Sequence, residues 1–530
     1  PPVRDNSFAV LPFVNVDGGE ETSIFAKGLV EDLMIRLTRV PGLLVSSRGD
    51  ANSLTANSPS STVRQRLRVA TYLMGSVQMA GDRIRVIVQM IDSATGFSLF
   101  SRSFDREREN FFEIRDEVTK LTVANIRVAL PADAVAASLQ TADEPEIDAY
   151  VLYRRGVEAL RSPTTVDVVN EALGWFDRAL EIDPEYGAAF AGRCEAYVRG
   201  FDAVDDATMI ERAESACTQA LALNPNLVVV PTALGDLYTA VGRYEEAVTY
   251  FTNALAINPT SSSALLGLGE VYLALNRPDA AENSFRQALG LVPGDWEAYN
   301  RYGIFLFKQG RYAEAAEQYE AVAALDPDNE SAYSNLGAAY SLTGDFAAAL
   351  KAFRRSIEIE PNKTAYTNLG TSHSFLGNQG KAIAAHRKAI EMEENDRLAW
   401  ANLGDALEAA GQTGEATKAF RRARELALTA LEANSRDPYT IMDLAWINAG
   451  LDDDAQAREL IDRALTLAPD DPYTHYYDAL IYLSAGSRRA AIDALEIAAE
   501  MGYSKPMLAA DPHLARLRSD SRFQAIVDKR

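Results

Sequence analysis

The side chains in this sequence that most often bind metal ions or form covalent bonds are two cysteines and four histidines. They are Cys194, Cys217, His373, His386, His475 and His513. No nucleophile elbow, phosphate-binding glycine loop, dinucleotide-binding fingerprint or zinc-protease motif accompanies them. His475 and His513 have no partners at ligand spacing. We therefore predict no catalytic residue, no metal site and no cofactor, and we expect that the chain is not an enzyme.

Cys194, Cys217, His373 and His386 lie in a part of the chain that repeats about every 34 residues. Each repeat carries a proline, a glycine and an alanine at fixed positions. The prolines are Pro225, Pro259, Pro293, Pro327 and Pro361; the glycines are Gly235, Gly269, Gly303, Gly337, Gly370 and Gly404; the alanines are Ala247, Ala281, Ala315, Ala349, Ala382 and Ala416. This period, with a proline that ends each unit, predicts stacked pairs of antiparallel helices, because one pair alone cannot bury its apolar face.

This pattern resembles the tetratricopeptide repeat (TPR) family. The resemblance implies an all-α, right-handed superhelical solenoid over residues 146–501, with about ten helical hairpins. Residues 502–530 are then expected to form a helical cap over the last apolar face, since solenoids need such a cap. TPR proteins bind a protein or peptide in the concave groove that the first helices of the hairpins line, so the resemblance implies a partner of that kind. A groove filled by segments of the chain itself would contradict this role.

Three asparagines mark the expected groove. Asn335, Asn368 and Asn402 each precede the repeated glycine by two residues. An asparagine side chain offers both a donor and an acceptor to a peptide backbone, and asparagines in this column of TPR proteins bind peptide backbone. The alternative is that these amides form hydrogen bonds between hairpins. Both interpretations stay open from the sequence.

The two cysteines also occupy repeat positions. Cys194 takes the place of the repeated glycine, and Cys217 takes the aromatic position that Phe251 holds in the next repeat. Both positions point into the same hairpin, so the sulfur atoms are expected on facing helices, near the roughly 5.5 Å Cα separation that a disulfide prefers. The residues either form a disulfide or remain buried thiols. A disulfide would indicate an oxidising compartment, and we predict a periplasmic or extracytoplasmic location, with the cytoplasm as the alternative.

His373 and His386 fall in one repeat, at positions that face each other inside the hairpin. A two-histidine metal site needs further ligands, and neither a cysteine nor an ordered group of carboxylates joins them. The sequence favours a packed polar pair.

Residues 1–131 do not repeat. A strand over residues 7–13 and a helix over residues 22–39 precede three alternating segments at 72–79, 83–92 and 98–105. A helix over residues 111–130 follows. These elements predict an α+β domain with an antiparallel or mixed sheet and covering helices, which a short linker at residues 132–145 joins to the repeats.

This domain resembles the TolB amino-terminal-like domain that precedes TPR arrays in many bacterial signalling proteins. The matching words are Ala-Val-Leu-Pro-Phe at residues 9–13, Gly-Leu-Val-Glu-Asp-Leu at 28–33, Gly-Ser-Val at 75–77 and Ala-Thr-Gly at 94–96. Leu99-Phe100 departs from the family, in which tryptophan is usual. The resemblance implies a regulatory or extracytoplasmic region of a bacterial protein.

The charge of the chain excludes one class of partner. Its net charge of −23 repels the phosphate backbone of nucleic acids and most anionic membrane surfaces. No apolar run reaches the roughly 18 residues of a membrane span, so we predict no nucleic-acid binding and no membrane insertion by these residues. The chain begins at Pro1, and we expect a processed protein or a fragment of a longer one.

The function predicted from these observations is a non-catalytic scaffold or sensory region that holds a protein or peptide in the TPR groove. One alternative is the regulatory region of a class III adenylate cyclase or a Ser/Thr protein kinase. Another is an assembly module that forms homo-oligomers through residues 1–131, in which case deleting these residues would abolish self-association.

Overall fold

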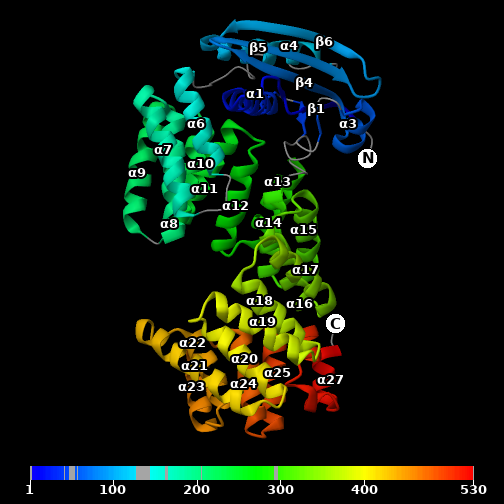
Figure 1. Ribbon diagram of the computed structural model, residues 1–530, viewed down its shortest axis with the longest axis vertical. Helices are drawn as coiled ribbons and strands as arrows, with labels where there is room; N and C mark the ends of the chain where they lie inside the picture. The colour runs from blue at the N-terminus through cyan, green and yellow to red at the C-terminus, as the bar shows by residue number, and fades with distance from the viewer. Residues whose placement is uncertain are drawn as a thin grey trace. The chain divides into compact units, whose positions relative to one another are not determined.

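The computed structural model describes residues 3–40, 42–46, 54–55, 58–126, 144–160, 165–204, 206–291 and 296–528. The chain divides into two compact units, Pro1–Arg301 and Tyr302–Arg530. The first unit holds a mixed sheet and the first helix pairs, and the second unit is helical (Figure 1). The predicted fold class, an α+β domain followed by a TPR-type helical solenoid, is confirmed.

The sheet of the first unit combines parallel and antiparallel strands. Its order is β3-β1-β4-β5-β6, and β2 also pairs with β4. The strands are β1 (Arg4–Val10), β2 (Val14–Asn15), β3 (Leu44–Val45), β4 (Val69–Ala80), β5 (Arg83–Asp92) and β6 (Ser98–Glu107). β1 is parallel to β3 and β4, whereas β4, β5 and β6 form the predicted antiparallel meander. Glycines with positive φ, Gly81 and Gly96, form its two turns.

Two helices cover one face of this sheet. α1 (Glu20–Thr38) places Phe25, Leu29, Leu33 and Leu37 on one side because they recur every four residues, and all four are fully buried. α4 (Phe111–Asn125) packs beside α1, and both helices share a hydrophobic core with the inner side chains of β5 (Figure 1). A short helix, α3 (Ser60–Leu67), precedes β4.

The first helix pair belongs to the same core as the sheet. α6 (Ile147–Ala159) contributes Ile147, Tyr150 and Val151 to the hydrophobic cluster of α1 and α4. A Cβ atom on Gly28 of α1 would lie 2.3 Å from the hydroxyl oxygen of Tyr150, so only glycine permits this approach. Residues 132–143 of the predicted linker lie outside the described residues, and the predicted domain boundaries stay a prediction.

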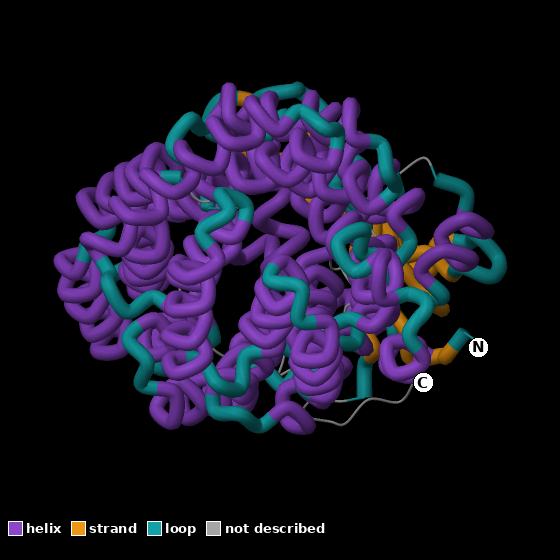
Figure 2. The backbone as a smooth tube through the Cα atoms, turned by 90° about the horizontal axis from the view of Figure 1, so that it is seen from below, coloured by secondary structure: helices purple, strands orange, loops and turns teal. Residues whose placement is uncertain are grey.

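Helix pairs then follow one another along the chain. In the first unit they are α6 with α7 (Val166–Ile182), α8 (Gly187–Val204) with α9 (Ala207–Leu223), α10 (Val229–Ala240) with α11 (Tyr244–Ile257), and α12 (Ser262–Ala274) with α13 (Pro278–Leu291). α14 (Trp296–Lys308) contains the boundary between the units. Figure 2 shows the pairs as adjacent rods joined by short loops.

In the second unit the pairs continue after α15 (Tyr312–Leu325). They are α16 (Glu330–Leu342) with α17 (Phe346–Ile359), α18 (Lys363–Phe375) with α19 (Gln379–Met392), α20 (Arg397–Ala409) with α21 (Thr413–Ala433), α22 (Pro438–Ala449) with α23 (Asp454–Leu467), and α24 (Pro472–Ser484) with α25 (Arg488–Glu500). The chain ends in α26 (Lys505–Ala510), a 3₁₀ turn η2 (Ala515–Leu517) and α27 (Ser521–Asp528).

One contact recurs in these pairs: an aromatic ring of the second helix lies on the glycine of the first helix. A Cβ atom on Gly235 would lie 2.5 Å from the ring of Phe251, and one on Gly337 would lie 2.6 Å from the ring of Phe353. The ring of Phe251 also lies against Gly267 of the following pair. The glycine column thus allows one ring to pack both helices of a pair and the next pair as well.

This contact gives a prediction that separates the ring packing from helix propensity. Gly235→Ala should lower the free energy of unfolding by about 1–3 kcal/mol because its methyl group would overlap the Phe251 ring. Gly174→Ala is the matched control, since Gly174 lies within α7 with nothing within 4 Å of its Cβ position, and it should gain up to about 1 kcal/mol from helix propensity. Urea unfolding measures both. Equal effects of the two variants would contradict this account.

Candidate partner-binding surface

The three predicted asparagines lie on the first helices of consecutive pairs in the second unit. Asn335, Asn368 and Asn402 belong to α16, α18 and α20, and each is half-buried. Each precedes its glycine by two residues, which is a rotation of about 200° around a helix. Because the glycine faces the second helix of its own pair, the asparagine faces away from that helix, toward the inner surface of the stack.

Two of these amides have unused hydrogen-bonding capacity. Across the described part of the chain, the side chains of Asn368 and Asn402 make no hydrogen bond, and their polar atoms are not buried. A half-buried amide without a protein partner can donate to and accept from a ligand backbone. Binding of peptide backbone by the three asparagines stays a prediction.

The inner surface continues from α20 to α24 with different side chains. Trp446 of α22 donates its indole N–H to the Asp405 carboxylate of α20, with both oxygens at 3.1 Å. Burial raises the pKa of Asp405 to about 6, and the charge of the neighbouring His513 opposes this shift. The ring of His513 meets the edge of Trp446 at a centroid distance of 5.2 Å. His513 therefore brings the C-terminal segment onto this surface.

Further contacts hold the C-terminal segment in place. The Tyr476 hydroxyl of α24 donates to Asp511 at 2.5 Å, and the ring of Tyr476 stacks on Tyr503 at 4.5 Å. Leu508, Leu514, Leu517 and Phe523 join the hydrophobic cluster of α24 and α25. These contacts form a cap over the last apolar face.

The same segment also reaches an earlier helix pair. The Ser504 hydroxyl donates to the carbonyl oxygen of Leu342, at the end of α16, at 2.6 Å. A Cβ atom on Gly344 would lie 3.0 Å from Cβ of Pro506. The segment from Ser504 to His513 thus contacts α16, α20, α22 and α24. Sequence reasoning missed that this segment covers inner side chains. No partner can use the Asp405 and Trp446 surface while the segment occupies it.

In the first unit the inner surface is charged. Arg301 contacts Glu270 of α12 at 3.0 Å and Glu297 at 2.6 Å. Burial raises the pKa of Asp236 to about 8, and the nearby charges of Glu195 and Glu270 act in the same direction. Asp236 and Glu270 follow the repeated glycine directly in the sequence, which is the signal that could have identified them.

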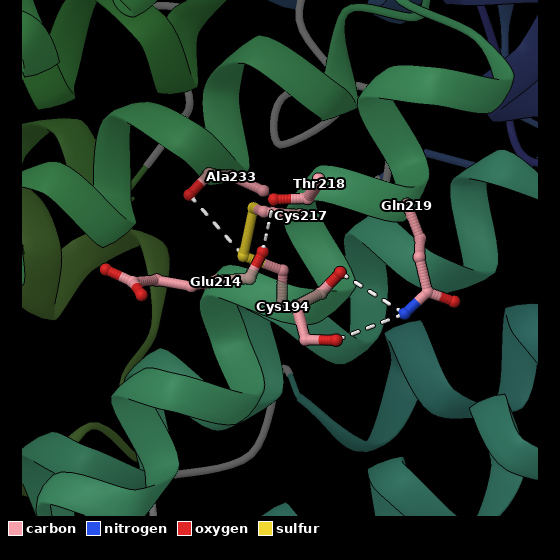
Figure 3. Close-up of a disulfide and its surroundings, with 7 residues drawn as sticks. Cys194, Glu214, Cys217, Thr218, Gln219 and Ala233 are labelled. Atoms are coloured by element: carbon pink, nitrogen blue, oxygen red, sulfur yellow. Dashed lines mark hydrogen bonds between the residues drawn. A yellow bond between two sulfur atoms is a disulfide. The ribbon is translucent and has the colours of Figure 1, made fainter.

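The structure joins Cys194 of α8 to Cys217 of α9 by a disulfide, with a Cα separation of 5.3 Å (Figure 3). Both residues are fully buried, and Sγ of Cys194 lies 3.9 Å from the carbonyl oxygen of Ala233 in α10. The cysteines thus occupy the space that a ring on a glycine fills in the other pairs. The redox state of the pair in the cell stays a prediction.

The two histidines of one repeat are buried in α18 and α19. His373 is 4% exposed and His386 is 1% exposed, and Nδ1 of each has no hydrogen-bond partner among the residues that the structure describes. The ring of His386 lies on Gly370, as the ring of Phe353 lies on Gly337. Burial lowers the pKa of His386 to about 4. Within the described residues, no group of three or more histidines, cysteines and acids could hold a metal ion.

Comparison with sequence families identifies the repeats. Four families, each described as tetratricopeptide repeat, match residues 211–293, 270–330, 306–371 and 364–396. These residues are TPR repeats. Residues 4–121 match the second domain of HilA/YgeH-like transcriptional regulators. The comparison thus gives a HilA/YgeH-like domain for this segment and does not show the predicted TolB-like domain.

One curated relative shares part of the chain. "Putative adenylate cyclase 3" of Rhizobium meliloti (strain 1021) is 37% identical over 186 residues, which are 35% of this chain and 31% of the relative. The match thus spans about a third of that protein.

Solved structures that resemble parts of the chain include a pilus biogenesis factor and a TPR protein. PilW, described as a widely conserved type IV pilus biogenesis factor, is 27% identical, covers 39% of this chain and 93% of its own, and has a TM-score of 0.34. YrrB, described as a TPR protein with an unusual peptide-binding site, is 26% identical, covers 36% and 95%, and has a TM-score of 0.26. In the part of the chain that the structure describes, no helix is both long and apolar enough to span a membrane.

The buried histidine gives a pH prediction. The unfolded chain binds a proton at His386 below pH 6.5, whereas the folded protein binds it only near pH 4, so stability falls as the pH drops from 6.5 to 4. The loss is about 3 kcal/mol. His386→Phe should remove this loss, because Phe353 and Phe420 fill the same position on Gly337 and Gly404. Urea unfolding at pH 7, 6 and 5 compares the two proteins, and parallel pH profiles would show that His386 does not titrate as described.

Proposed function

We propose that this chain is a non-catalytic scaffold that binds a protein or peptide on the inner surface of its TPR helix pairs. The observation that carries the proposal is the pair of half-buried amides of Asn368 and Asn402. They face away from the second helices and make no hydrogen bond in the described part of the chain. Their spacing follows the repeat, so an extended peptide backbone can contact consecutive helices in the same way.

The C-terminal segment restricts the surface that is open to a partner. Side chains of α22 and α24 already contact this segment through the Trp446–His513 and Tyr476–Asp511 contacts. A partner that binds at the asparagines meets a surface next to this segment. A partner that extends toward α22 competes with it.

We also propose that the scaffold regulates a signalling protein. Two similarities support this: the match of residues 4–121 to a domain of transcriptional regulators and the relative named as an adenylate cyclase. The finer assignment of residues 1–131 to a TolB-like domain rests on the sequence words at residues 9–13 and 28–33. In this proposal the enzymatic activity belongs to another domain or protein, and formation of cyclic AMP from ATP by this chain alone would contradict it.

The asparagines provide the test of peptide binding. Peptides selected from a displayed library on the purified chain should bind the triple variant Asn335→Ala, Asn368→Ala, Asn402→Ala at least about tenfold more weakly, since each lost hydrogen bond contributes roughly 0.5–1.5 kcal/mol. Isothermal titration calorimetry measures the affinities. Thr417→Ala, at a partly exposed position of α21, is the control and should bind as the unmodified protein does. Unchanged affinity of the triple variant would place the peptide elsewhere.

The proposed compartment is extracytoplasmic, and the facing positions of Cys194 and Cys217 support it. Protein isolated from its native cells in the presence of an alkylating reagent, and then denatured, should show no alkylated cysteine by mass spectrometry. Reduction before alkylation should yield two. Two alkylated thiols without reduction would instead favour the cytoplasm.

A further inference from the structure

A cavity of about 130 Å³ lies in the first unit, where α1 and α4 meet the first helix pairs. Its lining comes from α1, α4, α6 and the chain just before α8 and α10. The lining residues include Asp32, Arg36, Arg39, Arg115, Arg154 and Tyr153. Four guanidinium groups and one carboxyl group thus face a space that the partner-binding surface does not use.

The arginines of this cavity are removed from water. The side chain of Arg115 is 2% exposed, that of Arg36 is 5% exposed and that of Arg154 is 11% exposed. Buried charges of this kind need partners, because the desolvation of each ion costs several kcal/mol. In a chain whose net charge is −23, such a concentration of buried cations requires an explanation.

The carboxylates around the cavity satisfy these arginines incompletely. Arg36 contacts Asp116 through Nη2 at 3.1 Å, but its Nη1 atom is buried without a hydrogen-bond partner. Arg115 shares the same Asp116 at 3.1 Å, and its other contacts are longer, 3.4 Å to Glu144 and 3.7 Å to Asp32. Asp116 therefore serves two guanidinium groups, whereas Arg154 pairs with Glu31. Within the described residues, the Nη1 atom of Arg36 remains available to a ligand.

Arg36 and Arg115 repel each other inside the cavity wall. Burial lowers the pKa of Arg36 and the positive charge of Arg115 lowers it further, whereas Asp116, Asp32 and Glu144 oppose this shift. Burial also raises the pKa of Asp32, so the carboxyl group in the lining offsets the positive charge less than an exposed aspartate would. An oxyanion between these groups would accept the free N–H of Arg36 and reduce the repulsion between Arg36 and Arg115.

We propose that this cavity binds a small oxyanion, such as phosphate or a short carboxylic acid, through Arg36 and Arg115. A cavity of about 130 Å³ has room for such a group. Tyr153 and Tyr186, whose ring centroids lie 5.2 Å apart, form part of the wall. The bound anion would contact both the sheet domain and the first helix pair, and its binding would stabilise their packing. This inference is independent of the proposed peptide binding.

The experiment uses the whole chain and inorganic phosphate. Phosphate at ten times its dissociation constant should raise the midpoint of thermal unfolding by about 2–4 °C relative to chloride at the same ionic strength, and calorimetric titration should show one site. Sulfate and succinate, tested in parallel, distinguish a tetrahedral oxyanion from a dicarboxylate. A phosphate effect no larger than that of chloride, or calorimetry without binding for all three anions, would overturn the proposal.

Ile35 offers a matched pair of variants. It lines the cavity but is 38% exposed, so a charged side chain at this position leaves the core intact. Ile35→Glu places a negative charge at the cavity and should raise the dissociation constant of the anion about tenfold or more. Ile35→Lys, of similar size and opposite charge, should bind at least as tightly as the unmodified protein. Equal affinities of the two variants would show that the anion binds elsewhere.

Discussion

Most helix pairs of this protein share one packing constraint: an aromatic ring of the second helix lies directly on a glycine of the first helix. Phe251 is fully buried and contacts the positions of Gly235 and Gly267, in two successive pairs. A methyl group at either glycine would overlap the ring, so the separation of the helices is set by the absence of a side chain. The exceptions show the same constraint. His386 replaces the ring on Gly370, and in the pair of α8 and α9 two cysteines replace both partners.

The same kind of close approach joins the sheet domain to the first helix pair. Tyr150 of α6 lies over Gly28 of α1, and its ring contacts Phe111 and Phe112 of α4. This packing buries the neighbouring Arg36 and Arg115, which share Asp116. The cavity lies where the sheet domain meets the first helix pairs, because both carry charged side chains at this contact. A site for an anion thus arises where the domain and the solenoid meet within one compact unit.

The inner surface of the second unit is divided between free and occupied regions. The amides of Asn368 and Asn402 remain without hydrogen bonds in the described part of the chain, whereas Asp405 and Trp446 lie against the C-terminal segment. That segment is anchored by an apolar cluster at one end and by the Ser504 contact with α16 at the other. Any partner of this unit therefore binds beside a segment of the same chain, and its size is limited by that segment.

The sequence by itself determined the helix pairs, the meander of β4 to β6 and the facing positions of Cys194 and Cys217. Local spacing specifies all of these, because a repeat of small and bulky residues fixes which helix faces pack together. The sequence did not reveal that His513 contacts Trp446, or that Arg36 and Arg115 share one carboxylate. These contacts join residues far apart in the chain, and no periodicity relates them. Only the tertiary structure decided them, because the way separate helices meet depends on the packing of every element between them.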